Sequence, residues 1–150
     1  MRPTLALVIA INLLVSCQPA TPRPQLPDQI RACEAVFLPW LTRLTSEDKK
    51  AIRGIYFPDA GEVAFPDAFF EKYRGTVPPI LRTSELKGEA VENKDWFWHF
   101  SNLRLIDKDT IEMNAGYYCG GLCAMRCEYR VGRQPDGSWK IIGGTNCISS

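Results

Sequence analysis

The second half of this chain alternates apolar and polar residues with a period of two. Trp96, Trp98 and Phe100 share one parity, and the alternation continues through three later segments. Because successive side chains of a β-strand point to opposite faces, each segment is expected to be a strand with one apolar face. Turn signals at Asp107-Lys108-Asp109 and Pro135-Asp136-Gly137 separate some of them. We therefore predict an antiparallel meander of about four strands, 95–106, 109–118, 124–132 and 138–148.

The first half of the chain shows the spacing of helices instead. Apolar residues recur every three or four positions over 28–44, which predicts a helix that Pro39 is expected to kink or split. Shorter helices are expected over 45–53 and 66–74, with a short strand at Ile55-Tyr56-Phe57. Helices followed by strands predict an α+β domain with the helices packed on one face of the sheet. This order is similar to NTF2-like and cystatin-like folds, an analogy that carries no function.

The N-terminus has the organisation of an export signal. Arg2 precedes an apolar run from Leu5 to Val15, which only Asn12 interrupts. A run of about eleven residues fits the hydrophobic part of a signal peptide, whereas a membrane-spanning helix needs about 20. Leu14-Val15-Ser16-Cys17 then resembles the lipobox of bacterial lipoproteins. In that family the cysteine sulfur receives a diacylglycerol, the signal is removed before it, and the new amine is acylated.

This resemblance implies a domain organisation and a location. Residues 1–16 are expected to be a signal peptide, 17–27 a lipidated, palmitate-bearing Cys17 with a proline-rich tether, and 28–150 one globular domain. Gln18, where an aspartate would imply retention in the inner membrane, implies the outer membrane facing the periplasm if the source is Gram-negative. The membrane is then a partner of this cell-envelope protein through its lipid anchor. The alternative is an ordinary secreted protein in which Cys17 is incidental.

Five cysteines follow Cys17, so an exported chain is expected to form disulfides and leave one cysteine over. Cys119, Cys123 and Cys127 form a C-x3-C-x3-C pattern. Zinc with His99 as a fourth ligand, an iron–sulfur cluster and a thiol oxidoreductase site are the alternatives to disulfides. The spacing departs from the usual zinc and C-x-x-C patterns, so we expect structural disulfides, no metal and no cofactor.

Local geometry suggests how the cysteines pair. Gly120 and Gly121 permit the positive φ that a tight Cys119–Cys123 loop requires. If the next turn centres on residues 135–137, Cys127 falls opposite Cys147, within reach of a second bridge. Cys33 then remains a buried thiol, and a bridge from Cys33 to the sheet is the competing arrangement. The segment 116–123, with Trp139 downstream, also resembles small uncharacterised bacterial exported proteins that have no known activity.

Few residues point to catalysis. His99 is the only histidine, and Ser101 lies two positions along the same strand, roughly 6.5 Å away, too far for a nucleophile–base pair. The stripe of Trp96, Trp98 and Phe100 is expected to be core, and His99 structural. The acids Glu85, Glu89, Glu92 and Asp95 are expected in a solvated loop.

Charge and motifs limit the function classes. The formal net charge is +1, so no basic excess indicates nucleic acid. No phosphate-binding loop, H-E-x-x-H or G-x-S-x-G motif occurs. We therefore expect a non-catalytic module that binds a protein or small-molecule partner. The alternative is a small envelope hydrolase whose site the sequence does not locate.

Overall fold

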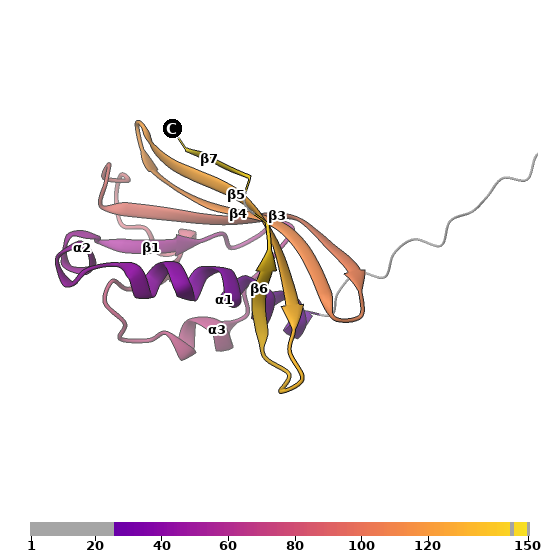
Figure 1. Cartoon of the computed structure of the whole chain (residues 1–150). Helices are drawn as coiled ribbons and strands as arrows, with labels where there is room; N and C mark the ends of the chain where they lie inside the picture. The colour runs from indigo at the N-terminus through magenta and orange to yellow at the C-terminus, as the bar shows by residue number, and fades with distance from the viewer. Residues whose placement is uncertain (1–25, 145, 150) are drawn as a thin grey trace, which may run out of the picture.

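The computed structural model describes residues 26–144 and 146–149. The signal segment, Cys17 and most of the expected tether lie outside these residues. Within them the chain forms helices and one mixed sheet, which confirms the α+β class (Figure 1). The elements are α1 (Leu26–Arg43), α2 (Ser46–Ala51), β1 (Gly54–Phe57), α3 (Asp67–Lys72), β2 (Ile80–Arg82), the 3-10 turn η1 (Thr83–Glu85), β3 (Asp95–Asp107), β4 (Thr110–Gly120), β5 (Cys123–Arg133), β6 (Trp139–Gly143) and β7 (Cys147–Ser149). No helix in this part of the chain is long and apolar enough to span a membrane.

The sheet has more strands than the predicted meander, and they are not all antiparallel. Its order is β2-β1-β3-β4-β5-β6, with β7 beside β5, and β1 runs parallel to both β2 and β3. All four residues of β1 are buried, so this strand lacks the period-two pattern on which the prediction rested. The single strand expected over 138–148 is instead divided into β6 and β7, and Gly144 between them has φ +99°.

Helix α1 packs across the apolar face of the sheet, beneath it in Figure 1. The ring of Phe37 lies 5.1 Å from that of Trp98, and Trp40 lies 5.2 Å from Trp96, so the tryptophan stripe belongs to the core as expected. The helix contains Pro39 and continues to Arg43, so the predicted split does not occur. Proline removes only one backbone donor, and the aromatic packing on both sides of it holds the helix against the sheet.

The second helix begins where its sequence signal indicates. The Thr45 hydroxyl accepts a hydrogen bond from the Asp48 N–H at 3.1 Å, and the Asp48 carboxylate accepts one from the Thr45 N–H at 3.0 Å. This reciprocal capping box satisfies two backbone donors at the helix start.

Asp95 corrects the expectation of a solvated acidic loop. It is 1% exposed, and its carboxylate accepts hydrogen bonds from Arg53 Nε at 2.8 Å and from the Val91 N–H at 2.6 Å. The parallel pairing of β1 with β3 places Gly54 beside Asp95, which brings Arg53 to the carboxylate. This long-range pairing leaves no trace in the local sequence.

Candidate functional site

The face of β3, β4 and β5 opposite α1 carries the main polar groups of the sheet, and we call it the open face. Cross-strand pairing aligns Ser101 with Asn114, and Asn114 with Glu128. Paired residues lie on the same side of a sheet, so these three side chains form one row across it. We call it the central row.

The middle of the central row is Asn114, whose amide has no hydrogen-bond partner among the described residues. Asn114 is 8% exposed, and its side chain makes no hydrogen bond with the described residues. Its neighbour Glu128 is exposed and accepts one long hydrogen bond, 3.3 Å, from the Asn146 amide. Within residues 26–144 and 146–149, no cation lies within ion-pair distance of Glu128. Both side chains therefore retain hydrogen-bonding capacity for a ligand.

The neighbouring row is, by contrast, internally satisfied. Glu112 lies between Arg104, whose guanidinium donates at 2.6 Å, and Arg130, whose Nε donates at 2.9 Å. The hydrogen bonds from Arg130 and Arg104 outweigh partial burial and lower the pKa of the Glu112 carboxyl. We call these three residues the charged row, and its geometry is fixed by its own ion pairs.

A β-bulge in β3 shapes the edge of this region. The pairing of β3 with β4 shifts between Ser101 and Arg104, and Asn102 adopts φ +55° there. The consecutive N–H groups of Asn102 and Leu103 each donate at 2.6 Å to the carboxylate of Glu62. Two such N–H groups form a backbone concavity that suits an anion, and Glu62 occupies it.

These features surround a groove of about 840 Å³ that crosses β3, β4, β5 and β6. Asn114 and Glu128 line it together with the charged row and Glu62, and Ile142 and Gly143 contribute from β6. Most of these side chains belong to the open face. The groove therefore combines a fixed charged wall with an unpaired amide and carboxylate.

His99 lies on the open face outside this groove. It pairs with Gly116, which in turn pairs with Arg126 on β5. Burial, and secondarily the charge of Arg126, lower the pKa of His99. No hydrogen bond joins His99 to Ser101 in the described structure, so the geometry supplies no activated nucleophile at this position.

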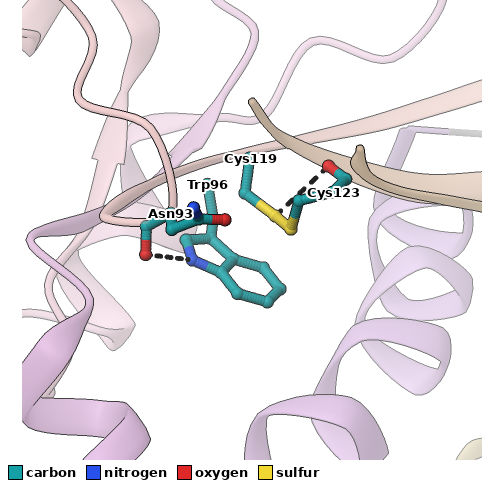
Figure 2. The surroundings of a disulfide bond; sticks show 4 residues. All are labelled: Asn93, Trp96, Cys119 and Cys123. Carbon is teal, nitrogen blue, oxygen red and sulfur yellow. Dashed lines mark hydrogen bonds between the residues drawn. A yellow bond between two sulfur atoms is a disulfide. The ribbon is translucent and has the colours of Figure 1, made fainter. Parts of the chain in front are cut away.

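The structure contains the first of the two expected disulfides. Cys119 and Cys123 are joined across the β4–β5 loop, with Cα atoms 5.2 Å apart. Figure 2 shows this bridge beside the indole of Trp96, whose N–H donates to the Asn93 carbonyl at 3.4 Å. The Asn93 N–H donates in turn to the Cys119 carbonyl at 2.6 Å, which ties the loop to the start of β3.

The second bridge also agrees with the predicted pairing. Cys127 and Cys147 are joined between directly paired positions of β5 and β7, with Cα atoms 4.1 Å apart. Cys33 is a buried free thiol, as the preferred arrangement required. Burial, together with the nearby carboxylates Glu34 and Glu62, raises the pKa of the Cys33 thiol. Such a thiol is neutral and inaccessible, which makes it chemically inert.

Sequence reasoning did not find the groove residues. The signal for Asn114 was its place in β4, where it alternates with Met113 and Ala115 and so faces away from the core. Within the described residues, no three His, Cys, Asp or Glu side chains are grouped so as to hold a metal ion. No protein-family model, curated protein or solved structure matches this chain.

Proposed function

We propose that this protein is a cell-envelope lipoprotein, anchored through Cys17, whose folded domain binds a ligand or partner without catalysis. The observation that carries the binding role is the groove with Asn114 at its centre. Asn114 lines this groove, and its amide makes no hydrogen bond with the described residues, so its donors and its acceptor remain available to a ligand. The charged row supports the same conclusion. Its ion pairs already fix the positions of these side chains, so they need no rearrangement when a ligand binds.

The anchor rests on the sequence and on its agreement with the cysteine chemistry. Leu14 to Cys17 match the lipobox, and the prolines that follow favour an extended spacer. Two disulfides suit an oxidising compartment beyond the cytoplasm.

The long helix α1 across strands β3–β6 supports an NTF2-like or cystatin-like classification, while the parallel strands β1 and β2 depart from the layout expected for either.

Metabolic labelling with palmitate tests the anchor. The wild-type chain is expected to take up label and to partition into detergent, and Cys17→Ser is expected to do neither. Cys33→Ser is the matched control because Cys33 is also a free thiol in the folded domain, and it should label normally. Labelling that persists in Cys17→Ser would show that the anchor lies elsewhere.

Site-specific photo-crosslinking in cells tests the binding role. A photoreactive residue at Ile142, which is 54% exposed and lines the groove, is expected to capture the partner. The same residue at the exposed Val77 serves as control, since Val77 does not line the groove. The adduct from position 142 should disappear when Asn114 is replaced by alanine. An adduct insensitive to Asn114→Ala would place binding outside the groove.

A further inference from the structure

We propose that the groove binds a basic peptide segment, with a main-chain amide on Asn114 and an adjacent lysine or arginine side chain on Glu128. This inference rests on the proposed binding function and names its ligand class. It follows from the hydrogen-bonding chemistry of one residue, the charge balance of the groove and the spacing between two neighbouring strands.

The amide of Asn114 matches a peptide bond. It offers one carbonyl acceptor and an NH₂ donor, and a peptide main chain presents the complementary N–H and C=O. Gly116 lies two residues after Asn114 on the same face of β4, and it has no side chain to cover the amide. A Cβ at this glycine would overlap the Met125 carbonyl oxygen and Arg126, so no side chain can stand beside Asn114 at this position.

The charge balance of the groove favours a cation. Its lining contains three carboxylates, Glu62, Glu112 and Glu128, and two guanidiniums, Arg104 and Arg130. Both arginines are engaged by Glu112. Glu62 is held by backbone N–H groups, so Glu128 is the carboxylate left to meet a ligand charge.

The surroundings of Glu128 restrict how that charge approaches. Arg126 and Arg130 flank it at two residues' distance on β5, and neither lies within 4.0 Å of its carboxylate. Glu128 would repel an anionic ligand group, and the residue that pairs with it on β4 is the uncharged Asn114. Side chains directly opposite on neighbouring strands have Cβ atoms about 4.5–5.5 Å apart. That spacing fits a main-chain amide beside its own long basic side chain.

Fluorescence polarisation with defined peptides tests the proposal, using the exported Cys17→Ser chain as a soluble form of the whole protein. The probe is a labelled, terminally blocked heptapeptide with one central arginine between alanines. A second peptide has citrulline at that position, which keeps the shape and removes the charge, and a third has glutamate. We expect the arginine peptide to bind, the citrulline peptide to bind about fivefold more weakly, and the glutamate peptide to bind more weakly still.

Variants assign the two contacts separately. Glu128→Gln should abolish the preference for arginine over citrulline, while Asn114→Ala should weaken both peptides about tenfold, equivalent to 1.4 kcal/mol. Asn114→Ser retains a polar side chain and provides a second variant, expected to be intermediate, if the alanine variant folds poorly. Glu47→Gln removes an exposed carboxylate on α2 and should leave both affinities unchanged.

Two results would overturn the proposal and separate it from the binding function beneath it. Equal affinity for the arginine and citrulline peptides, with both weakened by Asn114→Ala, would keep the groove as a binding site and reject a basic ligand. No peptide binding at millimolar concentration would reject a peptide altogether. In that case the crosslink from position 142 would still decide, independently, whether the groove binds a partner in cells.

Discussion

Asp95 is the most deeply buried charged side chain of the described residues, and its surroundings keep it ionised. Burial alone would raise its pKa, but hydrogen bonds from Arg53 and the Val91 N–H, with the charge of Arg53, hold the pKa below its ordinary value. Asp95→Asn should therefore destabilise the domain by about 2 kcal/mol, because it removes the charge-assisted bonds and leaves Arg53 without its partner. Urea unfolding measures this change.

The pH dependence of stability follows from the same shift. Since the pKa of Asp95 is lower in the folded chain than the roughly 3.9 of an unfolded aspartate, its stabilising contribution is complete above about pH 5 and is lost as pH falls through the folded value. The wild type should lose melting temperature more steeply than Asp95→Asn between about pH 5 and pH 2. Glu71→Gln breaks an exposed pair with Arg74 and should change neutral stability by less than about 0.5 kcal/mol. Parallel wild-type and Asp95→Asn curves would show that Asp95 does not carry this dependence.

Gly116 sets the close approach of β4 and β5. A methyl group at this position would overlap the Met125 carbonyl oxygen and the Arg126 Cα, which are backbone atoms that a side-chain rotation cannot move away. Gly116→Ala should cost about 3 kcal/mol in the free energy of unfolding. Gly143→Ala is the control, since its Cβ would meet only Arg130 Cβ, at 3.9 Å, and should change stability by less than about 1 kcal/mol.

Individual residues also show what the sequence allows one to predict of a site. The Cys119–Cys123 bridge was predictable because ring closure over three residues depends on local geometry alone. Asn114 and Glu128 could not be predicted as a site. They matter because they lie side by side on neighbouring strands and because few described side chains bond to them. An unpaired amide becomes visible only when every neighbour is placed.

At the scale of elements, β7 depends on its disulfide. It is three residues long, its residues are exposed, and among the described strands its one partner is β5. The Cys127–Cys147 bridge closes a loop with a sequence separation of 20, which should stabilise the fold by about 3 kcal/mol. Cys147→Ala should therefore lower the melting temperature by about 10 °C.

Cys33→Ala provides the comparison for this loss. It removes one buried sulfur atom and no cross-link, so it should cost roughly 1 kcal/mol. Thermal unfolding of the two variants in the same buffer gives the ranking. A larger loss in Cys33→Ala than in Cys147→Ala would mean that core packing, and not the bridge, limits stability.

The same elements explain where the sequence was sufficient and where it failed. Alternation identified β3, β4 and β5 within a few residues because each has one buried and one open face. The sequence predicted the strand β1 but not the strands with which it pairs. Its parallel pairing with β2 and β3 joins segments far apart in the chain. The pairing of Cys127 with Cys147 was predicted from the turn, although a register shift at Arg130–Val131 and the break at Gly144 lie between them.

On the scale of the whole molecule, the start of α1 and the Cys119–Cys123 loop lie far apart. Its first turn is tied to the end of β5 by the ion pair of Asp28 with Arg133. The Cys119–Cys123 loop lies at the opposite end of β5, and Figure 1 shows the two ends of this strand well separated. An 18-residue helix spans about 27 Å. The first turn of α1 and the disulfide loop therefore lie at opposite ends of the domain, and the groove crosses the strands β3 to β6.

The state of the cysteines reports on the folding of the whole molecule. The chain has six cysteines, and four of them are joined in the two bridges. In a Cys17→Ser background the remaining thiol is Cys33, which is fully buried and has a raised pKa. A maleimide reagent should therefore label no cysteine of the folded, exported protein, one after unfolding without reductant, and five after unfolding with reductant, as counted by intact mass.

The rate at which Cys33 is labelled should report global unfolding, because Cys33 lies between α1 and the sheet. A variant with a higher free energy of unfolding should be labelled more slowly. Asp95→Asn should accelerate it while Glu71→Gln should not, and rapid labelling of the folded wild type would show that α1 detaches from the sheet without global unfolding.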